Sequence, residues 1–224
     1  MTEKHEQVFL FDVDNTLLNN DQVELDLRRH LGSYLSPRDR DRFFQIFEEL
    51  RREVGYADYL GALERYRLEA LCDPKVLKVS CWLVDYPFAQ RLYPNSVDAV
   101  EHVRRWGAPV ILSDGDAVFQ PRKVERSGLW EVFKDRVLIY VHKEKMLGDV
   151  EMHYPAQHYV IVDDKLRLLA AIKKIWGKRV TTVFVKQGHY ANDPGVLERY
   201  PSADIQLDRI GSLLDYDRAA FLKG

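Results

Sequence analysis

A chain of 224 residues is long enough for one hydrophobic core with a smaller inserted domain. Its 46% hydrophobic and 30% charged residues are ordinary for a globular protein, and a formal net charge of −2 gives no electrostatic basis for binding nucleic acid or an anionic membrane surface. Because the first residues are polar and no apolar run reaches the roughly 18 residues of a membrane span, we expect a cytoplasmic protein. The small net charge makes a small soluble molecule the expected ligand. Cys72 and Cys81 do not have the spacing of a metal site, and we expect them to be reduced thiols.

The segment from Val8 to Leu18, VFLFDVDNTLL, places two carboxylates at the end of an apolar run. Residues 8–11 predict a buried strand, because the run is too short for a helix and rich in residues that favour strands. Asp12 and Asp14 follow at once, with one residue between them. A turn would account for Asp14 but not for Asp12, whereas a bound cation or a shared proton would offset the repulsion between the two carboxylates. We therefore predict a ligand site where this strand ends.

The spacing of the later elements predicts a parallel sheet with helices on both faces. Short apolar runs typical of strands alternate with segments whose apolar residues recur every three or four positions. This alternation indicates βαβ units and therefore a doubly wound, Rossmann-like α/β core. The later strands are expected at 108–112, 137–141, 159–162 and 180–185, and the helices between them at 96–106, 119–126 and 165–176.

A long helical insertion separates the first strand from the second. Residues 21–72 show helical periodicity, with Phe43, Phe44 and Phe47 on one predicted face, and no convincing strand pattern. An insertion directly after the strand that carries the carboxylates would lie over the ligand crevice, where it could exclude water and contact the substrate. We therefore predict an α-helical cap domain over 19–91 and an α/β core domain formed by 1–18 and 92–224.

Two polar features outside the strand ends each allow two interpretations. The stretch from Arg28 to Arg67 contains nine arginines and no lysine, which suits an anionic substrate. Most of these arginines alternate with acids, so a solvated helical surface is the simpler interpretation. Residues 187–190 follow the last predicted strand and could line the crevice, but we interpret them as a polar surface loop.

Polar groups stand at the ends of four predicted strands. The carboxyl ends of parallel strands share one edge of the sheet, and open α/β sheets bind ligands in the crevice outside that edge. We therefore expect the four groups to meet. They are Asp12 with Asp14, Ser113, Lys143 with Lys145 close behind it, and Asp163 with Asp164.

This combination suits phosphoryl transfer, which needs an in-line nucleophile, a Mg²⁺ ion to neutralise phosphate charge and donors to the phosphoryl oxygens. Mg²⁺ prefers oxygen ligands and keeps several waters, so two carboxylates and a carbonyl suffice to hold it. Asp12 can attack phosphorus to form an aspartyl phosphate, and Asp14 can protonate the leaving oxygen and then activate the hydrolytic water. The Ser113 hydroxyl and the Lys143 ammonium would bind the transferring phosphoryl group.

In this order, the motifs FDVDNTLL, ILSDGD, a lysine and VIVDDK resemble those of the haloacid dehalogenase superfamily of phosphohydrolases. They span essentially the whole predicted core, and the helical insertion resembles the small helical cap of that superfamily. The resemblance implies that Asp12 is the nucleophile and that Asp14 is the general acid/base and supplies a backbone carbonyl to the metal. It also implies that Ser113 binds phosphate, that Asp164 is a direct Mg²⁺ ligand and that Asp163 supports the metal directly or through water.

Asp14 narrows the chemistry that the resemblance implies. The dehalogenases of the superfamily lack an acid at this position, because a leaving halide needs no proton, whereas its phosphatases and phosphomutases keep one. The chain departs from the family pattern at two places. The lysine is usually followed by proline and stands further from the last motif, so Lys143, which is nearer the strand end, and Lys145 are both candidates. The last motif has Asp163 where many relatives have glycine, so either carboxylate of the Asp163 and Asp164 pair could touch the metal.

The function expected from these residues is that of a Mg²⁺-dependent phosphatase of a small phosphorylated metabolite. A phosphomutase would use the same residues but would shelter the aspartyl phosphate from water. A signalling receiver domain also combines an acidic pair, an acceptor aspartate, a hydroxyl and a lysine, but it has them in the reverse order on a shorter chain. A non-catalytic binding protein on the same fold is a third alternative, which the presence of both Asp12 and Asp14 disfavours. The sequence indicates neither the substrate nor the oligomeric state.

Overall fold

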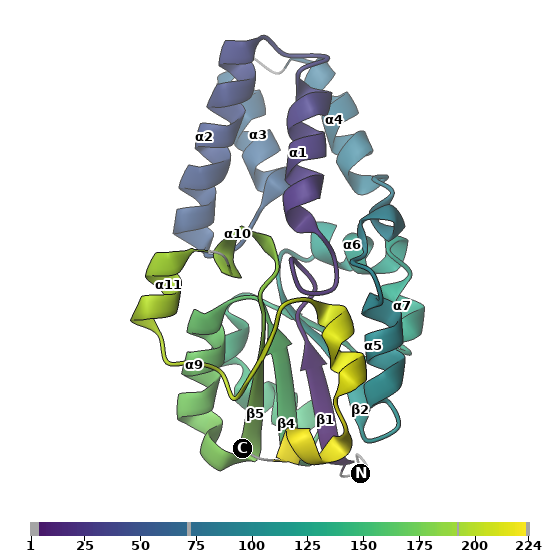
Figure 1. Cartoon of the computed structure of the whole chain (residues 1–224). Helices are drawn as coiled ribbons and strands as arrows, with labels where there is room; N and C mark the ends of the chain where they lie inside the picture. Colours follow the sequence, from purple (N-terminus) through teal and green to yellow (C-terminus); the bar gives the residue numbers. More distant parts are fainter. Residues whose placement is uncertain (1–4, 71–72, 192, 223–224) are drawn as a thin grey trace.

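In the computed structural model, which describes residues 5–70, 73–191 and 193–222, six strands form one parallel sheet (Figure 1). Their order is β3-β2-β1-β4-β5-β6, so the first strand lies in the middle, between β2 and β4. The strands are β1 (His5–Phe11), β2 (Ala108–Asp114), β3 (Val137–Tyr140), β4 (Ala156–Asp163), β5 (Val180–Val185) and β6 (Ile205–Leu207).

Helices cover both faces of the sheet because its central strands are apolar on both sides. Phe9 and Phe11 of β1 pack into one hydrophobic core with α5, α6 and α7, whereas Val8 and Leu10 pack into a second core with α8 and α9. Side chains alternate between the faces of a strand, so a continuous apolar run is the pattern of a strand buried on both faces. The predicted doubly wound α/β core is confirmed. Its helices are α5 (Ser96–Val103), α6 (Phe119–Arg126), α7 (Leu129–Val132), α8 (Leu147–His153) and α9 (Leu166–Trp176).

The helical insertion after β1 is present as a bundle above the carboxyl ends of the strands (Figure 1). Its longest helix, α2, begins after Ser36, whose side chain accepts a hydrogen bond from the N–H of Asp39, and ends at Gly55 in the left-handed conformation. The predicted apolar face of α2 is buried and includes Phe43 and Phe47. The helices are α1 (Asn20–Leu31), α2 (Pro37–Val54), α3 (Tyr59–Glu69) and α4 (Lys75–Val84).

Several short elements were not predicted, because they depend on tertiary contacts more than on their own sequence pattern. Strand β6 has three residues and pairs with β5, and α10 (Gly188–Ala191) and α11 (Pro194–Arg199) each have six residues or fewer. Isolated helices of this length are not stable in water. The remaining elements are short 3₁₀ helices, which are η1 (Phe88–Arg91), η2 (Lys143–Lys145), η3 (Gly177–Arg179), η4 (Ile210–Asp215) and η5 (Arg218–Leu222).

Within the described part of the chain, no helix is long and apolar enough to cross a membrane. Of the two cysteines predicted to be reduced thiols, Cys81 is exposed and carries no disulfide, and Cys72 lies outside the described residues.

A row of aromatic rings joins the helical insertion to the core. Phe47 of α2 stacks on Tyr59 of α3 with ring centroids 4.6 Å apart, and Tyr59 meets Phe119 of α6 edge to face at 5.5 Å. Phe119 in turn contacts Phe88 at 5.7 Å. These contacts fix the helical insertion over the end of the sheet.

Replacing Phe88 by alanine should lower the free energy of unfolding by about 3–5 kcal/mol, because Phe88 has no exposed surface and its removal leaves a cavity. Urea unfolding measures this change. Leu77→Ala on α4 is the control, because Leu77 is 52% exposed and its loss should change the free energy by no more than about 0.5 kcal/mol. Similar small changes in both variants would show that Phe88 does not hold the insertion in place.

Candidate active site

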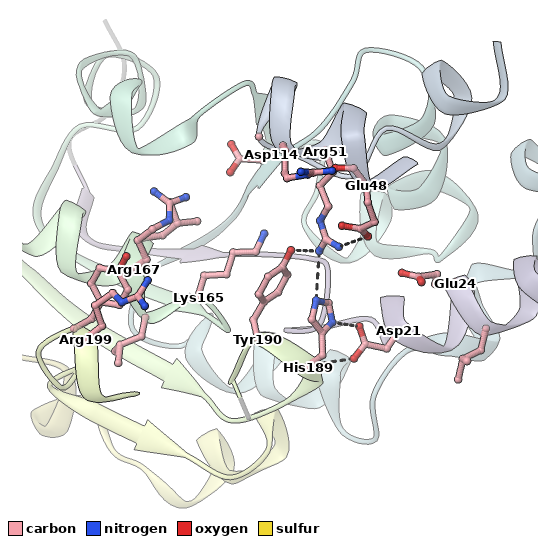
Figure 2. A pocket seen from close by; sticks show the side chains of 16 residues that line it. Asp21, Glu24, Glu48, Arg51, Asp114, Lys165, Arg167, His189, Tyr190 and Arg199 are labelled. Atoms are coloured by element: carbon pink, nitrogen blue, oxygen red, sulfur yellow. Dashed lines mark hydrogen bonds and ion pairs between the residues drawn. The ribbon is translucent and has the colours of Figure 1, made fainter. Parts of the chain in front are cut away.

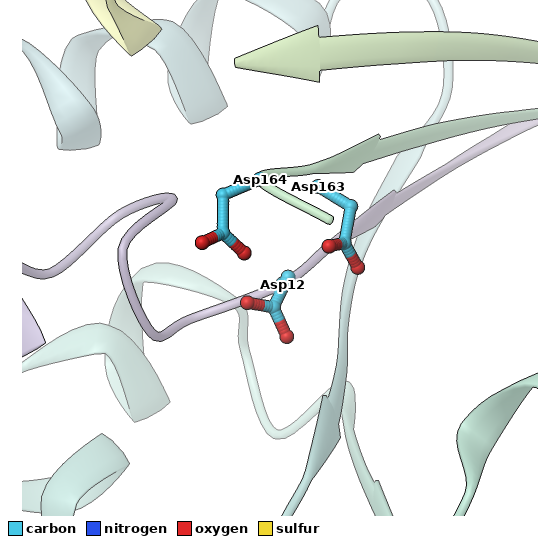
Figure 3. A group of neighbouring side chains, drawn as sticks. All are labelled: Asp12, Asp163 and Asp164. Atoms are coloured by element: carbon cyan, nitrogen blue, oxygen red, sulfur yellow. The ribbon is translucent and has the colours of Figure 1, made fainter. Parts of the chain in front are cut away.

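The carboxyl ends of β1 and β4 bring three aspartates together (Figure 3). Asp12 directly follows β1, Asp163 is the last residue of β4, and Asp164 comes next. One carboxylate oxygen from each lies within 4.8 Å of the other two, and all three side chains are buried. The central position of β1 beside β4 therefore places these carboxylates together, as the strand-end argument predicted.

The buried side chain of Lys143 reaches into this cluster from η2. Its Nζ lies 2.5 Å from Asp12 Oδ1 and 2.7 Å from Asp163 Oδ2, and it donates to the carbonyl of Leu112. Burial alone would lower the pKa of Lys143, but the carboxylates of Asp12 and Asp163 outweigh burial and raise it above the usual range. Lys145, in contrast, is exposed. Of the two candidate lysines, the structure brings Lys143 to the carboxylates.

Ser113 lies at the same edge of the sheet, near the end of β2. Its Oγ is 3.5 Å from Asp12 Oδ1 and accepts a hydrogen bond of 3.0 Å from Gln120 Nε2 of α6. The next residue, Asp114, accepts a 2.7 Å hydrogen bond from the backbone N–H of Lys143. The hydroxyl and the ammonium are thus both anchored beside the same oxygen of Asp12.

Asp163 and Asp164, which the sequence could not separate, have different surroundings. Asp163 is paired with Lys143 and accepts a 2.8 Å hydrogen bond from the N–H of Lys165. Asp164 is also buried, yet neither of its oxygens has a hydrogen-bond partner among the described residues, and Asp12 Oδ2 has none either. Burial raises the pKa of Asp164 well above its usual range.

A buried carboxylate without a partner is costly, so these oxygens mark a place for a cation. Mg²⁺ prefers carboxylate oxygens, and the free oxygens of Asp12 and Asp164 fit it. Asp163 already forms an ion pair with Lys143, which suits a supporting position beside the metal.

Asp14 lies in the same pocket but is held by a second lysine. Lys123 of α6, which is 1% exposed, donates to both carboxylate oxygens of Asp14 at 2.6 and 2.8 Å and to Asn20 Oδ1 at 3.1 Å. The loop that carries Asp14 is shaped by Asn15, which has φ of +58° and accepts the N–H of Asn20 at the start of α1. Lys123 was not predicted as a site residue, because FQPRKVER has the charge pattern of a solvent-exposed helix.

The interpretation of residues 187–190 as a polar surface loop was wrong. His189 and Tyr190 of α10 line a cavity of about 890 Å³ between the helical insertion and the core (Figure 2). Their neighbour Gly188 has φ of +71°, and an added Cβ there would come within 2.5 Å of the side chain of Asn15. Lys165, which was not predicted as a site residue, lines the same cavity, and its position directly after Asp164 is the sequence signal that places it there.

Comparison with known proteins shows which family the chain belongs to. No family model matches the chain, and no curated protein matches it. Among solved structures, a protein of Burkholderia xenovorans assigned to the haloacid dehalogenase-like hydrolases is 56% identical, with a TM-score of 0.93 over 96% of this chain and 98% of its own.

Two more distant structures share the fold. The HAD-hydrolase YfnB of Bacillus subtilis, solved with bound magnesium, is 17% identical, with a TM-score of 0.63 over 96% of this chain and 100% of its own. The L-2-haloacid dehalogenase of Xanthobacter autotrophicus is also 17% identical, with a TM-score of 0.61 over 94% and 97%. With 56% identity to the Burkholderia protein over nearly its whole length and an acidic cluster at the sheet edge, this chain belongs to the haloacid dehalogenase-like hydrolases.

Proposed function

We propose that this hydrolase is a Mg²⁺-dependent phosphatase that cleaves a small phosphorylated metabolite through an aspartyl phosphate on Asp12. The observation that carries the proposal is the buried cluster at Asp12. There Lys143 Nζ and Ser113 Oγ lie beside one oxygen of Asp12, and Asp164 presents two unpartnered oxygens. A phosphoryl group transferred to Asp12 Oδ1 would be within reach of both donors, which supports its stabilisation during transfer.

In the first step, a carboxylate oxygen of Asp12 forms a bond to phosphorus and the ester P–O bond breaks. The leaving oxygen takes a proton from the Asp14 carboxyl group, which lines the same pocket. In the second step, water gives a proton to the Asp14 carboxylate and attacks phosphorus, and the bond between phosphorus and Asp12 breaks to release inorganic phosphate. When bound by Asp12, Asp164 and the backbone carbonyl of Asp14, Mg²⁺ would neutralise charge on the phosphoryl oxygens.

Phosphate release from p-nitrophenyl phosphate, with Mg²⁺ and with EDTA, tests this function. We expect release that requires Mg²⁺. Release of halide from L-2-chloropropionate without release of phosphate from any ester would contradict the proposal and would indicate carbon–halogen cleavage instead.

The variant Asp164→Asn tests the metal site without relying on activity. In EDTA it should be at least as stable as the native protein, because it removes the charge of a buried carboxylate whose oxygens have no hydrogen-bond partner, while the lost attraction to Lys165 limits the gain. Added Mg²⁺ should raise the thermal unfolding midpoint of the native protein but not of the variant. Asp208→Asn, at a side chain that is 93% exposed, is the control and should behave as the native protein does. Equal Mg²⁺ stabilisation of native protein and Asp164→Asn would place the metal elsewhere.

A further inference from the structure

We propose that Arg51 binds a second anionic group of the substrate, a carboxylate or a phosphate on the part of the molecule that leaves. The preferred substrates are then phosphate esters that carry another acidic group. This inference rests on the proposed phosphatase function and adds to it a substrate class and the residue that selects it.

Two adjoining pockets indicate where each part of the substrate binds. The pocket that contains Asp12, Ser113 and Asp164 has a volume of only about 40 Å³, enough for a phosphoryl group in place of a few waters. The larger cavity of about 890 Å³ opens beside it and is within the range of ligand sites. The leaving part of the substrate therefore extends into the larger cavity. The residues that line both are Arg51, Gly55, Asp114, Lys165, His189 and Tyr190.

Arg51 is held in position at this junction (Figure 2). It projects from α2, where Nη1 donates to Glu48 Oε1 at 3.2 Å, while Nη2 contacts the hydroxyl of Tyr190 and lies 3.4 Å from His189 Nε2. The centre of the guanidinium lies 4.9 Å from the centroid of the Tyr190 ring. Because these contacts already order the side chain, binding an anion costs little further side-chain entropy.

The guanidinium keeps donors for a ligand. It has five N–H groups in a planar fork that matches a carboxylate or a phosphate. No described residue accepts a hydrogen bond from Nε of Arg51, and the side chain is 19% exposed, so it can be reached from the cavity.

The other arginines of the insertion do not combine these features. All nine arginines between Arg28 and Arg67 are among the described residues, and Arg51 is the one that lines both pockets. Arg42, for example, is paired with Glu69 at 2.6 Å on the surface. The interpretation as a solvated helical surface therefore suits the other arginines of the insertion better than it suits Arg51.

The acidic residues of the larger cavity already have partners. Asp21 Oδ1 lies 2.6 Å from His189 Nδ1, and Asp114 accepts a hydrogen bond from the N–H of Lys143. Glu48 is paired with Arg51, and the charge of Glu24 is offset by Arg51 and by Arg28, which lies 3.8 Å away, so an anionic ligand would share Arg51 with these two carboxylates. Further cationic side chains stand on the other side of Tyr190, where Figure 2 shows Arg167 and Arg199. An anionic group in the cavity would thus meet cations on two sides, which favours its binding.

Matched phosphonates test the proposal, because their carbon–phosphorus bond is not hydrolysed. Calorimetry in Mg²⁺ would measure the affinity for 3-phosphonopropionate and for n-propylphosphonate, which has a methyl group in place of the carboxylate. The affinity for propane-1,3-bisphosphonate would show whether the site prefers a second phosphate-like group to a carboxylate. 3-Phosphonopropionate and propane-1,3-bisphosphonate both carry a second anionic group. The native protein should bind one of these two ligands about 10–100-fold more tightly than n-propylphosphonate, as expected for a charge-assisted hydrogen bond. In Arg51→Gln this preference should fall below about threefold.

Arg38→Gln is the control, because Arg38 is exposed on the same helix, away from both pockets, and this variant should keep the native preference. Arg51→Lys, which keeps the charge but not the planar fork, should show an intermediate preference. Equal binding of all three phosphonates by the native protein would overturn the Arg51 site and leave the phosphatase function standing. A preference that survives in Arg51→Gln would also overturn it, and binding of none of the three would contradict both proposals.

Discussion

Asp12→Asn should reduce Mg²⁺-dependent phosphate release from p-nitrophenyl phosphate by at least about 10³-fold, because an amide cannot serve as the nucleophile that a carboxylate provides. The substitution preserves the size of the side chain. The buried Lys143 keeps Asp163 as a counterion 2.7 Å away, so the fold should survive the loss of one charge.

Circular dichroism and the thermal unfolding midpoint provide the control for this variant. Ser113→Ala offers a comparison at the same oxygen of Asp12, since it removes one donor to the phosphoryl group and should cost less than the loss of the nucleophile. Phosphate release by folded Asp12→Asn at the native rate would exclude Asp12 as the nucleophile.

Asp14→Leu should lose both activity and stability. The rate constant kcat should fall by about 10²–10⁴-fold, because the group that transfers protons to the leaving oxygen and from water is gone. The free energy of unfolding should fall by about 3–5 kcal/mol, because Lys123 is 1% exposed and would lose its carboxylate partner, keeping only Asn20 Oδ1. Lys123→Met should cost less stability, since the Asp14 side chain is 19% exposed and water can reach it.

The double variant Asp14→Leu with Lys123→Met separates the two effects. Replacing both partners of a buried ion pair by apolar side chains is often neutral for stability, so the double variant should recover most of the stability that Asp14→Leu loses. It should recover none of the activity. If the double variant were as unstable as Asp14→Leu, the uncompensated charge of Lys123 would not be the cause of the instability.

The elements that position the nucleophile could be predicted from the sequence because they depend on local patterns. The run from Val8 to Phe11 is apolar on both faces, and only a central strand buries both faces. Once the strands are parallel, their carboxyl ends must share an edge, which brings Asp12, Ser113 and Asp164 together without any knowledge of loops.

The features that the sequence left undetermined depend on how whole elements pack. Lys123 and Arg51 stand among other charged residues on their helices, and only the placement of α6 and α2 over the sheet edge decides which charge is turned inward. Asp163 and Asp164 are neighbours of the same type, so only their partners in three dimensions distinguish them. Tyr190 lies in a four-residue helix that has no sequence signal of its own.

The most direct test of the aspartyl phosphate mechanism is to trap the intermediate. The native protein would be mixed with Mg²⁺ and p-nitrophenyl phosphate and quenched in acid, and its peptides would be analysed by mass spectrometry. We expect one phosphoryl group on the peptide that contains Asp12, specifically on that side chain, and none in EDTA or in Asp12→Asn. Phosphate release without a phosphorylated Asp12 in repeated early quenches, or a phosphoryl group on another residue, would contradict the mechanism.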